Sequence, residues 1–123
     1  MSQVAYVKIT VGEEEKLMKY DYNAVADLED MYDTGLFELL DEKKMGLRTI
    51  RALYWAGLKW KEPKMTLAKA GNIVEQLLVE GTDLEDLTQP IFKALQKAKF
   101  IKALGVEFDE VPAEGDGGES DPN

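Results

Sequence analysis

The chain has 123 residues, of which 45% are hydrophobic and 32% charged, a balance typical of a folded protein with one core. It contains no cysteine and no histidine. Neither a thiolate nor an imidazole can therefore act as a nucleophile, a general base or a metal ligand. We therefore expect no catalytic residues, no metal site and no cofactor, and the protein is predicted not to be an enzyme.

The formal net charge of −9 is unevenly distributed. Seven acids and no bases follow Gly105, so residues 1–105 hold 17 of the 24 acids against 15 bases, a net charge of −2. We predict a single globular helical domain with an N-terminal hairpin over residues 1–105. Residues 106–123, rich in glycine, proline and acids, are predicted to form a disordered acidic tail.

The chain shows no membrane or export signal. Its first residues lack a basic stretch followed by an apolar run, and no apolar run approaches the roughly 20 residues that span a bilayer. We therefore expect no membrane association and a cytoplasmic location.

The first predicted element is a β-hairpin. Residues 4–10 are rich in β-branched and aromatic side chains, and residues 16–22 alternate apolar and polar side chains. Between them, residues 11–15 contain Gly12 and read as a turn. Because an isolated hairpin is marginal in water, we expect it to pack on the helices.

A first helix is predicted to begin at an Asn23 N-cap and to end near Gly35, which suits a left-handed C-terminal position. A short apolar piece, 36–40, is predicted to add one or two helical turns. The first helix is predicted because its apolar residues recur at helical spacing, at Val25, Leu28, Met31 and Tyr32.

The central helix is predicted over about residues 46–58, with Pro63 beyond its end. It is apolar almost all round, so neighbouring elements should bury it. Thr66 is predicted to cap a third helix that ends at Gly81. Its apolar stripe consists of Leu67, Ala70, Ile73, Val74, Leu77 and Leu78.

The region after Thr82 contains Pro90, which should not sit deep inside a helix. We therefore predict a turn or short helix over 83–87 and a separate helix, capped by Thr88, that continues to about Leu104. The fold class predicted is mainly α with a small hairpin (α+β), in a compact bundle of four to five short helices.

Four residues of the central region, Arg48, Arg51, Trp55 and Lys59, are spaced to share one helix face. One hypothesis is a docking surface for an acidic or nucleic-acid partner. The other is that the arginines lie over a partly buried tryptophan with their charges in solvent. The acidity of the whole chain argues against nucleic acid.

Two further features have open interpretations. The acidic tail is a nucleic-acid mimic, a cover for the basic face, a handle for a partner, or a solubilising terminus. The surplus of apolar residues in short segments either fills the core or leaves a groove that binds a helix or a second copy of the chain.

The order of these segments resembles the tail assembly chaperones of long-tailed bacteriophages (siphophages) and related prophages. The hairpin is followed by NAVADLE at 23–29, RALYWAGL at 51–58 and TLAKAGNIV at 66–74, with a last helix after LTQPIFKAL. The resemblance covers about residues 4–103.

The resemblance implies a non-enzymatic viral protein. Such chaperones bind the long helical tape measure protein, keep it soluble, help to recruit the tail tube protein, and are displaced as the tube polymerises. It implies self-association, a location in the host cell cytoplasm and absence from the mature virion. We predict partner contacts at Trp55, Leu58, Trp60, Arg48 and Arg51, and on the apolar face formed by Leu36, Leu39 and Leu40.

Two alternative functions remain open. One is a small nucleic-acid-binding regulator that uses the basic central helix. The other is another virion component, such as a head-tail completion protein.

Overall fold

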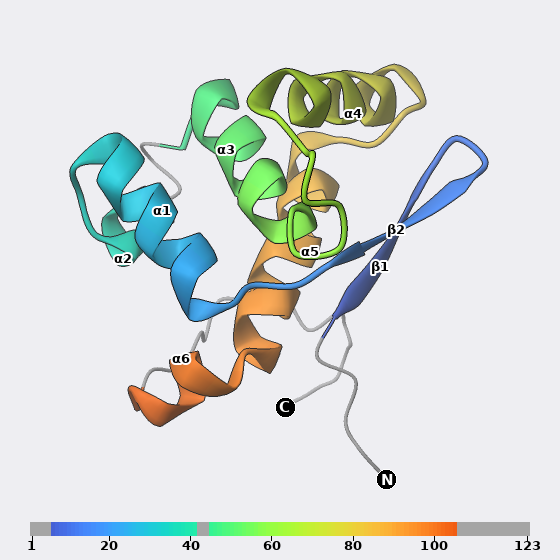
Figure 1. The fold of residues 1–123 in the computed structure, drawn as a ribbon. Helices are drawn as coiled ribbons and strands as arrows, with labels where there is room; N and C mark the ends of the chain where they lie inside the picture. Colours follow the sequence, from blue (N-terminus) through green and yellow to red (C-terminus); the bar gives the residue numbers. More distant parts are fainter. Residues whose placement is uncertain (1–5, 42–44, 106–123) are drawn as a thin grey trace, which may run out of the picture.

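The computed structural model describes residues 6–41 and 45–105, and the predicted acidic tail lies outside them. Within these ranges a two-stranded hairpin is followed by six helices, four of them substantial (Figure 1). This confirms the predicted fold class. The elements are β1 (Val7–Val11), β2 (Glu14–Met18), α1 (Tyr22–Tyr32), α2 (Leu36–Leu39), α3 (Leu47–Leu58), α4 (Leu67–Val79), α5 (Leu84–Lys97) and α6 (Lys99–Ala103).

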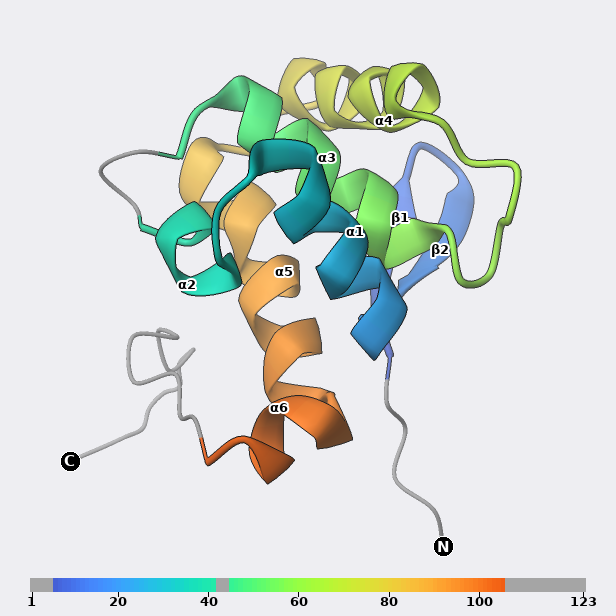
Figure 2. The same ribbon diagram turned by 60° about the vertical axis from the view of Figure 1, so that its left-hand side comes forward.

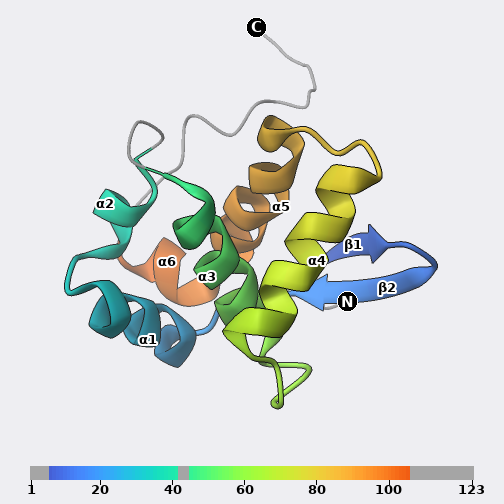
Figure 3. The same ribbon diagram turned by 90° about the horizontal axis from the view of Figure 1, so that it is seen from above.

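Helix α3 lies at the centre of the described fold. It contacts α1, α4, α5 and β2, and Figures 1 and 3 show α1 on one side of it and α4 on the other. Seven of its twelve residues are buried, and Leu53 and Leu58 have no exposed surface. Neighbours on several sides explain why α3 is apolar almost all round.

The hairpin packs on α3, as predicted. The strands are antiparallel, with Val7 opposite Met18, and Gly12 adopts a positive φ of 63° in the turn between them. After β2, the Lys19 amide donates a hydrogen bond to the Gly57 carbonyl at 2.8 Å. The buried Tyr20 hydroxyl donates to the Leu53 carbonyl at 2.6 Å. These bonds attach the end of the hairpin to the central helix.

The absence of a side chain at Gly57 allows this close approach. A Cβ atom at position 57 would lie 2.6 Å from Met18 Cγ and 3.0 Å from Tyr20 Cζ. Both neighbours are fully buried, so neither has room to move away.

We therefore expect Gly57→Ala to destabilise the protein by about 1–3 kcal/mol, because overpacking outweighs alanine's better helix propensity. Gly71→Ala on α4 is the matched control. A Cβ atom there would lie 3.1 Å from Arg51 Cδ, and the flexible arginine side chain can move away. Urea unfolding of both variants measures the difference. Equal stabilities for the two would contradict the close packing at Gly57.

Two predicted helix ends were wrong by two residues. The N-cap of α1 is Asp21, whose side chain accepts a 2.8 Å hydrogen bond from the Ala24 amide, and not Asn23. The left-handed residue after α1 is Asp33, with φ 53°, whereas Gly35 is extended and precedes α2. Aspartate suits both positions because its short polar side chain hydrogen-bonds locally. The predicted Thr66 cap of α4 is confirmed by its bond to the Lys69 amide.

The predicted break near Pro90 was also wrong. Helix α5 runs unbroken from Leu84 to Lys97, with Asp83 as its N-cap, and α6 turns away after Ala98 (Figure 2). Proline removes one hydrogen bond to the Asp86 carbonyl. The buried stripe on both sides of Pro90 outweighs that loss, and it consists of Leu87, Ile91, Ala94 and Leu95.

Candidate functional site

An open groove lies between α3 and α4, with a volume of about 460 Å³. We call it the α3–α4 groove. Leu47 at the start of α3 is 65% exposed, and Leu78 near the end of α4 is 39% exposed. Exposed large aliphatic side chains that share a groove are typical of a binding surface. The lining residues are Leu47, Arg48, Arg51, Gly71, Val74, Glu75 and Leu78.

The Arg51 side chain reaches from α3 to α4 at Gly71. A Cβ at position 71 would lie 3.1 Å from Arg51 Cδ, so the glycine leaves space for the arginine stem. The Arg51 Nε is buried, and no described residue accepts a hydrogen bond from it. Because buried donors are normally paired, Arg51 stands out among the residues of the groove.

The other cations of the predicted basic face are occupied within the protein. The Arg48 guanidinium lies 5.6 Å from the centre of the Tyr32 ring, and the Tyr32 hydroxyl donates to the Arg48 carbonyl at 3.0 Å. Lys59 pairs with Asp27 and lies 4.1 Å from the Trp55 ring centre. The cation over the half-buried tryptophan is therefore a lysine and not an arginine.

Trp60 fastens the segment after α3 to the hairpin. Its indole Nε1 donates to the Leu17 carbonyl at 3.0 Å, and its ring stacks on Tyr6 with centroids 6.2 Å apart. The Lys19 ammonium lies 5.0 Å from the ring centre. These contacts give Trp60 a structural role, and its predicted contact with a partner stays a prediction.

Four leucines predicted as partner contacts lie in the core. Leu58 has no exposed surface, and the leucines of 36–40 turn inward. The apolar face of that segment is therefore the core side of α2, because its leucines belong to the same core cluster as the buried residues of α1 and α3. Little of their surface is exposed in the described fold, and their predicted contact with a partner stays a prediction. The four residues are Leu36, Leu39, Leu40 and Leu58.

A second, smaller groove of about 210 Å³ lies where α1, α2 and α6 meet. Phe37, on the outer side of α2, is 49% exposed and lines it. The rings of Tyr22 and Phe100 meet edge to face beside it, 5.8 Å apart. The exposed apolar surface of α2 is therefore carried by Phe37.

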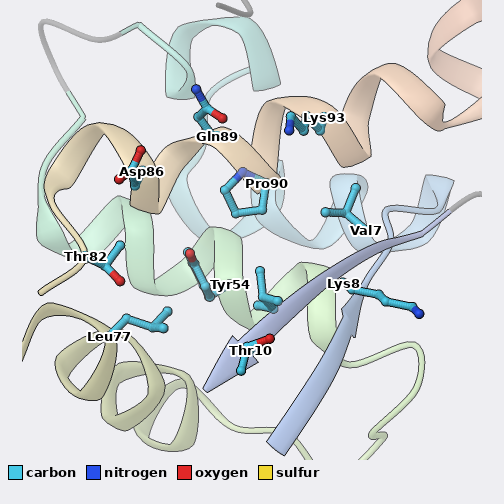
Figure 4. Close-up of a pocket in the computed structure, with 11 residues that line it drawn as sticks. Val7, Lys8, Thr10, Tyr54, Leu77, Thr82, Asp86, Gln89, Pro90 and Lys93 are labelled. Atoms are coloured by element: carbon cyan, nitrogen blue, oxygen red, sulfur yellow. The ribbon is translucent and has the colours of Figure 1, made fainter. Parts of the chain in front are cut away.

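A third groove, of about 350 Å³, lies between β1 and α5 (Figure 4). Polar side chains dominate its wall, among them Lys8, Asp86 and Gln89. The Tyr54 hydroxyl donates to the Leu87 carbonyl at 2.8 Å, so its proton is already engaged. Burial raises the pKa of Tyr54 well above its usual range. Burial also raises the pKa of Tyr20, and the nearby Tyr54 adds a smaller electrostatic contribution in the same direction. Both phenols stay protonated at neutral pH.

In the ranges 6–41 and 45–105, no three acidic side chains gather closely enough to hold a metal ion. None of the helices in those ranges has the length and apolar character needed to cross a membrane.

Sequence reasoning missed Leu47, Gly71 and Leu78 as groove residues. A signal for Leu78 was present, because Leu77 and Leu78 are adjacent and point about 100° apart on a helix. Only Leu77 is buried. No sequence signal pairs Gly71 with Arg51, since that contact depends on how α3 and α4 cross.

The described residues form a small helical domain with an N-terminal hairpin and open grooves on its surface. No protein-family model, curated protein or solved structure matches the chain.

Proposed function

We propose that this chain is a tail assembly chaperone of a long-tailed bacteriophage or prophage. In this role it binds the helical tape measure protein, keeps it soluble, helps to recruit tail tube subunits and is later displaced. The observation that carries the proposal is the α3–α4 groove, with Leu47 and Leu78 exposed along it. Three of the segments that resemble the family lie on α1, α3 and α4, and the last two of these helices form the groove.

The physical demands of the role fit such a surface. A long amphipathic helix aggregates unless its apolar face is covered, and a groove between two helices is a common way to cover it. Later displacement from the tape requires that the affinity of each single contact be modest. Many copies along one tape add avidity without tight binding at any single site.

The nucleic-acid alternative has less support. Arg48 and Lys59 direct their charges onto aromatic rings of the same protein, and the chain carries a net charge of −9. Binding to phosphates would require those cations to leave their rings and overcome long-range repulsion. A head-tail completion protein would use similar apolar surfaces, so the choice of partner in the experiment separates the two.

Co-expression with the tape measure protein of the same phage tests the proposal. We expect the soluble fraction of the tape to rise severalfold when this chain is present. An unrelated acidic protein of similar size is the control. If the tape stays insoluble while this chain remains soluble and alone, the chaperone proposal is wrong.

A further inference from the structure

We infer that the α3–α4 groove binds an amphipathic helix of the partner that presents a carboxylate to Arg51 between apolar side chains. This inference rests on the proposed function, since the tape measure protein supplies the helix. It adds the binding surface, the residue that recognises the partner, and the chemistry that the partner segment must carry.

The apolar part of the inference comes from Leu47, Val74 and Leu78. Val74 lines the groove and is buried, whereas Leu47 on α3 and Leu78 on α4 are exposed. A helix laid between α3 and α4 would cover both leucines and remove apolar surface from water. Its own apolar residues, spaced three and four apart, would meet them.

The charged part comes from Arg51. Its stem lies against Gly71, and its buried Nε lacks an acceptor among the described residues. A buried donor without an acceptor is unfavourable, and a turn of the arginine side chain that brought this donor to a carboxylate of the partner would satisfy it. Arginine also suits this task because its planar fork donates two parallel hydrogen bonds to one carboxylate.

Charge complementarity favours an acidic partner segment as the occupant of the α3–α4 groove. Two arginines and one acid, Glu75, line the groove, so it is locally basic on a protein that is acidic overall. A basic helix would place like charge against Arg51 with no acceptor for its Nε. An entirely apolar helix would cover the leucines and leave that donor unpaired.

The test titrates overlapping peptides from the tape measure protein into the full chain and measures affinity by fluorescence anisotropy. We expect binding by peptides that carry an acid within an apolar helical stripe. Arg51→Glu should weaken it at least tenfold, and replacing the peptide's acid with lysine should restore binding to that variant. Lys102→Glu, an exposed charge reversal on α6, should change affinity less than twofold.

The apolar arm compares two exposed leucines. Leu78→Ala in the groove should weaken peptide binding severalfold, whereas Leu84→Ala on α5 should not. Thermal melts followed by circular dichroism establish that each variant is folded before its affinity is compared.

The outcomes separate this inference from the proposed function. If Arg51→Glu and Leu78→Ala bind the tape as the unaltered chain does, the groove is not the site and the chaperone proposal stands. If the unaltered chain binds neither the peptides nor the full-length tape, the proposed function itself is wrong. Amide NMR shifts in 47–51 and 71–78 on dilution alone would assign the groove to a second copy and overturn the inference. If neutralising two acids of the chain's own acidic segment, by Glu107→Gln and Asp109→Asn, shifts the same amides, that segment occupies the groove and the inference is overturned.

Discussion

Leu58→Ala is expected to destabilise the protein by about 2–5 kcal/mol, the range for removing a large aliphatic side chain from a packed core. Leu58 has no exposed surface and lies at the end of α3, next to Gly57, where the hairpin meets the helix. The neighbours on several sides of α3 limit how far the cavity can collapse. Urea unfolding followed by tryptophan fluorescence measures the change.

Leu47→Ala is the matched control for this prediction. It deletes the same atoms from the same helix, but at a site that is 65% exposed, so the expected change in unfolding free energy is within about 0.5 kcal/mol. The two variants also separate stability from binding, because Leu47 lines the groove and Leu58 does not. A Leu58→Ala protein as stable as the parent would mean that Leu58 is not in the core.

Alkaline pH is expected to unfold the protein steeply because of Tyr20 and Tyr54. Burial raises the pKa of both phenols above the usual value near 10. Above pH 10 the unfolded chain releases these protons while the folded protein keeps them, so the free energy of unfolding falls as pH rises. The expected slope is about 1.4 kcal/mol per pH unit for each tyrosine, until the folded-state pKa is reached.

Tyr54→Phe should reduce this alkaline slope by about half, because one of the two buried phenols is removed. It should also lower stability at neutral pH by about 1 kcal/mol, since the hydrogen bond to the Leu87 carbonyl is lost. Tyr22→Phe, which alters a ring that is 68% exposed, is the matched control. An unchanged slope in Tyr54→Phe would contradict the role given to its burial.

The central helix and the fold class could be predicted because their signals are local and strong. A run such as 50–58 has no polar face and must be covered by its neighbours, and Thr66 stands directly before a clear apolar stripe. The start of α1 was predicted at Asn23 and lies at Asp21, because aspartate and asparagine both satisfy the local rule for a cap. The burial of Tyr20 fixes the chain just before Asp21, and that contact is with α3, far along the sequence.

Pro90 shows how tertiary contacts override a local rule. The sequence predicted two elements because proline breaks an isolated helix. In the fold, Leu87 lies before the proline and Ile91 after it, both fully buried, so a single helix places the two in the core together. A rule based on backbone hydrogen bonds alone could not weigh that packing.

The groove could be predicted only in part. The sequence indicated spare apolar side chains and placed Arg48 and Arg51 on one face, but it assigned the apolar contacts to leucines that are buried. Which leucine of a stripe faces outward depends on the crossing of α3 and α4.

The mass of the complex that co-purifies with the tape measure protein is the most direct test of the central claim. Light scattering coupled to gel filtration gives that mass, and one copy of this chain contributes 13.8 kDa. We predict a soluble complex whose mass requires many copies of the chain on one tape. A tape that aggregates while the chain elutes alone as a 13.8 kDa monomer would contradict the account.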